Sequence, residues 1–133
     1  MARIFADKKF VGTWKCTTKI KEVIFNETNL NFPAQVTKIL YISNTQGGTI
    51  MYFSVPGPES RGIPAVKASG IGVQFVLSGQ NDKYKLKEDI RINIKDNANL
   101  IGESVQEWSL PGKGVVAKLI TRSDYHRVGR MKN

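Results

Sequence analysis

Residues 87–95 read KEDIRINIK, and from Asp89 onward apolar and polar side chains alternate strictly. In an extended chain Ile90, Ile92 and Ile94 fall on one face, and the charged and amide side chains between them fall on the other. This period of two predicts a β-strand with one buried and one solvated face. The same period recurs through most of the sequence, so the expected fold class is all-β.

The first long segment, residues 11–25, shows the same alternation and predicts a strand. Lysines and threonines would face outward, and the inner face would carry Trp14, Cys16, Thr18 and Ile20. Two further strand patterns, at residues 35–44 and 49–55, flank Gln-Gly-Gly at 46–48. Because glycine adopts the positive φ angles of tight turns, this arrangement predicts a β-hairpin.

Stretches rich in glycine and proline interrupt the strand pattern. Residues 56–64, PGPESRGIP, predict a long irregular loop, because proline cannot donate to a strand ladder. Such a loop suits either a flap over an opening or an ordinary solvated connection. Residues 65–79 predict one more strand, or a strand with a bulge between Gly70 and Gly72. Further turns are expected at residues 81–83, 97–99 and 111–114.

Counting these segments gives about eight strands joined mostly by short turns, which predicts an antiparallel up-and-down β-barrel, or else a sandwich. A chain of 133 residues has the size of one domain, so residues 1–133 are expected to form a single barrel. A barrel of about eight strands holds either packed side chains or one small ligand. The sequence does not distinguish a filled interior from a hollow one.

Composition and charge narrow the environment and the partners of the chain. Hydrophobic residues make up 41% and charged residues 23%, which is typical of a globular protein rather than a disordered one. No apolar run of about eighteen residues and no signal-peptide core are present, so we expect no transmembrane segment and a cytoplasmic location. Cys16 is the only cysteine, which excludes an internal disulfide. The net charge of +9 favours an anionic partner.

Both ends of the chain resemble one superfamily. Residues 10–15, FVGTWK, resemble the Gly-x-Trp signature of the calycins, which include the lipocalins and the intracellular fatty-acid-binding proteins, and residues 119–122, LITR, resemble their final strand. The resemblance implies a barrel that carries a small apolar or amphipathic molecule. It also implies that Trp14 closes one barrel end and that Arg122 covers the ring. Apart from the resemblance, a glycine two residues before a large buried aromatic lets the backbone pass close to the ring, which is the role expected of Gly12.

Neither calycin subfamily matches throughout. The fatty-acid-binding proteins place a helix pair after the first strand, and residues 19–32 have no helical stripe. Lipocalins usually carry a long helix after the barrel, and this sequence shows no such pattern after residue 125. We therefore expect a lipocalin-like barrel without assigning it to either subfamily.

Arg122 and Tyr125 resemble the Arg-x-Tyr pair that anchors a fatty-acid carboxylate in the cytosolic binding proteins. Here two residues intervene, which puts the two side chains on opposite faces of a regular strand. Either a bulge restores the pair, or Arg122 alone serves and packs on Trp14. The remaining predicted ligand contacts are Tyr41, Phe53, Phe75 and Ile92. They belong to a larger set of apolar residues expected to face inward, which is Ile39, Tyr41, Met51, Phe53, Val73, Phe75, Leu77, Ile92, Val105 and Leu119.

Other chemistry has less support in the sequence. Ser123, Asp124 and His126 lie close together, but alternation puts Ser123 opposite the other two, so they do not form a catalytic triad. One cysteine and one histidine, without a ligand spacing, do not make a metal site. The sequence therefore favours a binding protein over an enzyme, indicates no metal and names no cofactor.

We expect the protein to bind or carry a small hydrophobic or amphipathic molecule, with an acidic group as one option for its polar end. The alternative is binding of nucleic acid or another polyanion through lysine-rich outer strand faces. A third option is a barrel-based isomerase, cyclase or chromophore lyase. The oligomeric state stays open. The outward basic residues of the alternative are Lys15, Lys19, Lys21, Lys83, Lys85, Lys87, Arg91 and Lys95.

Overall fold

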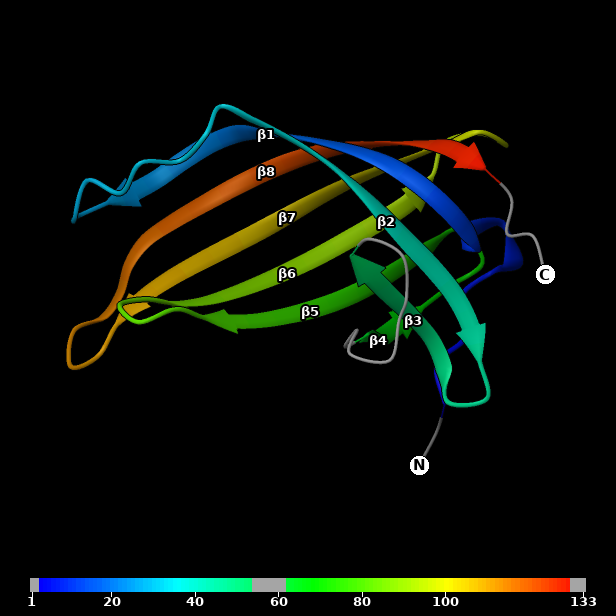
Figure 1. Ribbon diagram of the computed structural model, residues 1–133, viewed down its shortest axis with the longest axis horizontal. Helices are drawn as coiled ribbons and strands as arrows, with labels where there is room; N and C mark the ends of the chain where they lie inside the picture. The colour runs from blue at the N-terminus through cyan, green and yellow to red at the C-terminus, as the bar shows by residue number, and fades with distance from the viewer. Residues whose placement is uncertain (1–2, 54–61, 130–133) are drawn as a thin grey trace.

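Eight antiparallel strands close into a barrel in which neighbours in sequence are neighbours in space (Figure 1). This computed structural model describes residues 3–53 and 62–129. It confirms the predicted fold class, an all-β up-and-down barrel of about eight strands. The strands are β1 (Gly12–Asn26), β2 (Gln35–Thr45), β3 (Gly48–Phe53), β4 (Ile63–Ala68), β5 (Gly72–Gln80), β6 (Lys85–Ile94), β7 (Asn99–Leu110) and β8 (Gly114–Gly129).

Helix is nearly absent from the described residues. A single 3₁₀ turn, η1 (Lys8–Phe10), precedes β1, and the Asp7 side chain caps it by accepting a hydrogen bond from the backbone N–H of Lys9. None of the helices in the described ranges has the length and apolar character needed to cross a bilayer.

Alternation along the strands divides inside from outside as predicted. On β6, Ile90 and Ile92 are buried, whereas Arg91 and Asn93 are exposed. The same alternation buries Trp14 and Cys16 on β1 and exposes the lysines of its opposite face. Apolar side chains from all eight strands thus meet in one core.

The predicted hairpin between β2 and β3 is confirmed, and it shows why a glycine is needed there. Thr45 pairs with Gly48, and Gly48 has a φ of 115°. A Cβ atom at this position would lie 2.7 Å from the carbonyl oxygen of Ile4. Glycine therefore permits both the turn and the close approach of the N-terminal segment, whose Ile4 carbonyl accepts a hydrogen bond from Thr49.

The prediction of one strand across residues 65–79 is wrong. The chain turns at Ser69, whose N–H donates to the Gly72 carbonyl at 2.9 Å, and β4 and β5 then pair antiparallel. Gly70 and Ile71 thus lie in a tight turn that leads into β5 at Gly72, and they do not form a bulge. Of the predicted loop at 56–64, Ile63 and Pro64 belong to β4, and residues 56–61 lie outside the described ranges. Pro64 is at the start of its strand, where proline is tolerated.

The two ends of the barrel differ in how completely their strands pair. We call the end where β1 begins and β8 finishes the closed end; it lies on the right in Figure 1. Toward the other end, the open end, β1 pairs with β2 only as far as Lys19, and the β4 ladder on β5 reaches only Phe75. Beyond these points a curved sheet of β5, β6, β7, β8 and β1 remains, and residues 27–34 run back from it to β2 (Figure 1).

Candidate functional site

Trp14 and Arg127 seal the closed end. The Trp14 side chain is fully buried, and its Nε1 donates to the carbonyl of Phe10 at 2.9 Å. The guanidinium carbon of Arg127 lies 4.3 Å from the centre of the indole ring, a cation–π contact. Its Nη1 donates to the carbonyl of Val11 and its Nη2 to that of Lys9, each at 2.8 Å. The arginine thus fastens η1 over the end of the barrel.

The expectation that Arg122 covers Trp14 is wrong, because the two residues are on opposite faces. Buried residues on β8 are odd-numbered from Ala117 to Tyr125, and Arg127 continues that series. Arg122 is even-numbered, and its exposed side chain lies on the outer face, across from Glu103 and Lys19. No bulge on β8 between Arg122 and Tyr125 restores the Arg-x-Tyr pair.

Gly12 has the role of permitting close approach, but its partner is Arg127. Gly12 has a φ of 148°, a conformation that L side chains rarely adopt. A Cβ atom there would clash with Nη1 of Arg127. The glycine therefore leaves room for the guanidinium that packs on Trp14.

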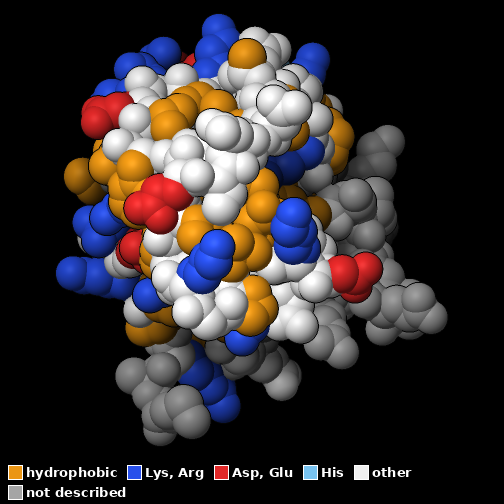
Figure 2. Space-filling model, turned by 90° about the vertical axis from the view of Figure 1, so that its left-hand side faces the viewer, with side chains coloured by type: hydrophobic (Ala, Val, Ile, Leu, Met, Phe, Trp, Pro, Cys, Tyr) orange, Lys and Arg blue, Asp and Glu red, His pale blue; other side chains and the backbone are white. Residues whose placement is uncertain are grey.

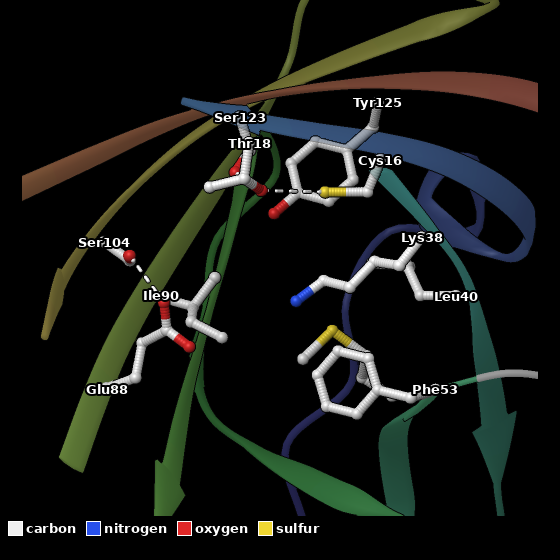
Figure 3. Close-up of a pocket in the computed structure, with 11 residues that line it drawn as sticks. Cys16, Thr18, Lys38, Leu40, Phe53, Glu88, Ile90, Ser104, Ser123 and Tyr125 are labelled. Atoms are coloured by element: carbon white, nitrogen blue, oxygen red, sulfur yellow. Dashed lines mark hydrogen bonds between the residues drawn. The ribbon is translucent and has the colours of Figure 1, made fainter. Parts of the chain in front are cut away.

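A small cavity lies inside the barrel, between the closed end and the open end (Figure 3). Its open space, measured for the centre of a water-sized sphere, is about 20 Å³, which is room for about one water molecule. Apolar side chains line one side, and hydroxyl, thiol, carboxylate and ammonium groups line the rest. The lining residues are Cys16, Thr18, Lys38, Leu40, Met51, Phe53, Glu88, Ile90, Ser104, Ser123 and Tyr125.

Glu88 is the centre of a buried hydrogen-bond network. Its side chain is 7% exposed, and its Oε2 accepts from Ser104 Oγ at 2.7 Å and from Gln106 Nε2 at 2.9 Å. Because the Ser104 hydroxyl hydrogen is used on Glu88, Thr121 must donate in the 2.6 Å bond between their oxygens. Trp108 Nε1 in turn donates to Gln106 Oε1 at 3.1 Å. The network thus runs from the cavity to the open end.

A second set of polar groups faces this network from β1 and β8. Thr18 and Ser123 share a hydrogen bond of 2.7 Å, and Cys16 Sγ lies 3.5 Å from the Thr18 hydroxyl. Burial raises the pKa of Tyr125 well above its usual value, because a phenolate there would be desolvated, and the neighbouring Cys16 adds to the shift. The Tyr125 hydroxyl therefore stays neutral at physiological pH.

Lys38 reaches into the cavity from β2, on the wall opposite Glu88 (Figure 3). Its Nζ lies 4.5 Å from the centre of the Phe53 ring, a cation–π contact. Sequence reasoning missed both Lys38 and Glu88, although a signal for each was present. Glu88 is two residues before Ile90, and Lys38 is two residues before Leu40. Since residues two apart share a face of a strand, the alternation that buries the apolar residues also turns these two charged side chains inward.

The open end carries a larger, mainly apolar groove of about 420 Å³. Figure 2 shows this end, with hydrophobic side chains in its middle and lysine and arginine side chains beside them. The Phe32 ring packs on Trp108 with a centre-to-centre distance of 5.5 Å. Thr18 lines both this groove and the inner cavity. The other lining residues are Ile20, Leu30, Asn31, Phe32, Pro33, Val36, Asn81, Tyr84, Gln106, Trp108, Leu119 and Thr121.

The connection between β1 and β2 that forms one side of this groove is held by Asn26. Its Nδ2 donates to the Leu30 carbonyl, and its Oδ1 accepts from the Leu30 N–H, each at 2.9 Å. The Glu27 N–H also donates to the carbonyl of Val116 at 2.8 Å. Asn29 adopts a φ of 53° within this turn. Local hydrogen bonds thus hold Leu30 and Phe32 on the groove.

The predicted ligand contacts divide into three groups. Phe53 and Tyr125 line the inner cavity. Phe75 and Ile92 are fully buried core residues and line neither the cavity nor the groove. Tyr41 is buried, but it is not part of the core cluster, because it alternates with Leu40 and Ile42 on β2, and its ring lies 6.2 Å from that of Tyr52.

Most of the residues predicted to face the barrel interior do so, but the prediction is wrong for some of them. Ile39 and Val105 are exposed, contrary to the expectation that they face inward. Leu40 and Ile42, which were not expected inside, take the inner positions of β2 instead of Ile39 and Tyr41. Met51, Val73 and Leu119 are buried as expected.

On the outer face, acidic residues lie between the basic residues of neighbouring strands. On β7, Glu103 pairs in register with Arg91 on one side and Arg122 on the other, and Glu107 lies between Lys87 and Lys118 in the same way. Lys21 forms an ion pair of 2.7 Å with Glu103, which lowers the pKa of that carboxyl. The lysines of β6 and those of β1 are thus separated by acidic residues, which weakens the case for one continuous phosphate-binding surface.

Comparisons with known proteins give no relative: no protein-family model, curated protein or solved structure matches this chain. The barrel, its inner cavity and the groove at the open end therefore carry the functional argument.

Proposed function

We propose that the protein binds a small amphipathic molecule, with its apolar part in the groove at the open end and its polar end directed toward the inner cavity. The observation that carries the proposal is the position of the apolar groove, which adjoins a polar cavity inside the same barrel. Sites for small molecules are typically concave and apolar with a few polar groups that fix orientation. The groove volume of about 420 Å³ lies within the range of such sites.

The affinity would come mainly from burial of apolar ligand surface. A chain that buries about 200 Å² gains about 5 kcal/mol at about 25 cal/mol per Å². This gain alone corresponds to a dissociation constant of about 0.2 mM, and the lost freedom of the ligand offsets part of it, so we expect tighter binding only where polar contacts add to the apolar burial. Polar contacts in the inner cavity would then set orientation and specificity.

The fold supports a further part of the proposal, that the chain is a calycin-like barrel. A closed barrel of eight antiparallel strands is consistent with that superfamily. Gly12 and Trp14 provide the signature at the first strand, and a basic residue, Arg127, packs on the tryptophan. These three features together are what the resemblance implies, with Arg127 in place of Arg122.

Titration of the protein with a panel of amphiphiles tests the proposal, because Trp108 lines the groove and reports on its occupation. Val36→Asp places a carboxylate in the groove, and we expect it to weaken binding at least tenfold. Val66→Asp is the matched control, since Val66 is an equally simple strand valine, 49% exposed against 40% for Val36, and lies outside the groove.

Two results would contradict this proposal. One is that no amphiphile in the panel changes Trp108 fluorescence up to its solubility limit. The other is that Val36→Asp and Val66→Asp weaken binding equally. Measuring binding at increasing salt concentration distinguishes the polyanion alternative from amphiphile binding, because phosphate binding weakens steeply with salt whereas burial of apolar surface does not.

A further inference from the structure

One carboxylate oxygen of Glu88 accepts no hydrogen bond from the described residues. Both hydrogen bonds to its carboxylate from the described residues, from Ser104 and Gln106, reach Oε2. The other oxygen points into the inner cavity (Figure 3). Glu88 is only 7% exposed, but this oxygen is not among the fully buried atoms that lack a partner, so it is accessible from the cavity and can accept a hydrogen bond from a ligand group there.

Lys38 offers the complementary group on the opposite wall. Its ammonium lines the same cavity, and among the described residues it forms no ion pair with Glu88. The ammonium can only donate, and the carboxylate can only accept. A ligand group that lies between them must therefore accept from one wall and donate to the other.

The charges of the two walls disfavour an ionised ligand group. A carboxylate in the cavity would be repelled by Glu88 as well as attracted by Lys38, and an ammonium would be repelled by Lys38 as well as attracted by Glu88. Attraction to one wall is thus offset by repulsion from the other, and neither ion recovers the hydration that it loses on entering the cavity. A hydroxyl satisfies both walls, because it donates one hydrogen and accepts through its lone pairs.

The size of the cavity points to the same group. Its space of about 20 Å³ holds about one water-sized group, which matches a hydroxyl and is small for the two oxygens of a carboxylate. Thr18 lines both spaces, so a tail in the groove would pass this residue to bring its polar end into the cavity.

We propose that the binding site selects a neutral apolar alcohol, whose hydroxyl donates to Glu88 and accepts from Lys38, over a carboxylate or an amine with the same tail. This inference rests on the proposed function and specifies the chemical class of its ligand. It replaces the acidic polar end that the sequence suggested, which Arg122 or another inward basic residue was expected to orient. Arg122 lies on the outer face, and the inward Lys38 shares its cavity with the carboxylate of Glu88.

Four probes with one common tail test the selection: decanol, decanoate, decylammonium and decyl methyl ether. We expect decanol to bind at least tenfold more tightly than either ionised probe. The ether, which accepts but cannot donate, should fall between decanol and the ions. This ranking is measured on the unaltered protein, so it does not depend on how any variant folds.

Removing either charge should change the ranking in a defined way. Glu88→Gln removes the repulsion, and we expect it to strengthen decanoate binding about tenfold and to reduce the preference for decanol. Lys38→Met should likewise strengthen decylammonium binding. Glu103→Gln and Lys15→Met, on the outer face, are the matched controls and should leave all four affinities unchanged.

The outcomes separate this inference from the function on which it rests. If all four probes bind with similar affinity, the groove binds amphiphiles and the selection for a hydroxyl is wrong. If decanoate binds as tightly as decanol, or if Glu88→Gln affects all probes equally, the selection is again wrong. If none of the four binds, both the selection and the proposed function fail.

Discussion

The two ends of the barrel contain one tryptophan each, and the two residues differ in almost every respect. Trp14 at the closed end is fully buried under Arg127 and forms part of the core. Trp108 at the open end is partly exposed, packs on Phe32 and lines a groove. Strand pairing explains the difference, because β2, β3 and β4 complete the wall only toward the closed end. One end therefore stabilises the fold, and the other leaves apolar surface available for a ligand.

The largest expected effect comes from truncating each tryptophan in turn. Trp14→Ala should lower the free energy of unfolding by about 3 to 5 kcal/mol, because it leaves a cavity among fully buried side chains. Trp108→Ala should cost about 1 kcal/mol, since its ring is partly exposed. Urea denaturation measures both losses, and Trp14→Phe provides a milder substitution for the same comparison. Equal losses for the two alanine variants would show that the ends do not differ in this way.

A medium effect is expected at the arginine that seals the closed end. Arg127→Ala removes two charge-assisted hydrogen bonds and the contact with Trp14, so we expect a loss of about 2 kcal/mol. Arg122→Ala, on the exposed outer face of the same strand, should change stability by no more than about 0.5 kcal/mol. The two variants are compared by thermal and urea denaturation. A larger loss from Arg122→Ala would overturn the assignment of Arg127 to the seal.

The smallest effect is expected at the open end. Asn26→Ala removes both hydrogen bonds to the Leu30 backbone and should cost about 1 kcal/mol of stability. Hydrogen exchange should show faster exchange of the Leu30 amide, with little change at the closed end. Asn97→Ala, an exposed turn asparagine, serves as the control. Unchanged protection of the Leu30 amide would show that Asn26 does not hold this segment on the groove.

Alternation predicts the faces of a strand well where only one face is apolar. On β6 the isoleucines alternate with charged and amide residues, so the inner face follows directly from the sequence. On β2, Ile39, Leu40, Tyr41 and Ile42 are all apolar, and the pattern does not show which pair faces inward. Pairing with β1 and β3 decides it, since Leu40 and Ile42 lie opposite Trp14 and Met51. Val105 is a related error, because single apolar residues are common on exposed faces.

The errors at the candidate site have a different origin. Arg122 was predicted to cover Trp14 because its position resembles a family motif. On β8, however, the odd-numbered residues face inward, so Arg127 lies on the inner face and Arg122 on the outer face. Glu88 was not identified because charged residues are rarely buried without partners. Its partners, Ser104 and Gln106, come from the neighbouring strand, and their hydrogen bonds appear only when the register of β6 and β7 is known.

The sequence by itself determines that the chain forms antiparallel strands joined mostly by tight turns, and that one glycine and one tryptophan begin the first of them. These features depend on local backbone preferences and on alternation, which are written residue by residue. Only the tertiary structure decides which end of the barrel stays open and what its interior presents to a ligand. Closure places β2 opposite β6, so Lys38 and Glu88, which are distant in sequence, line the same water-sized cavity.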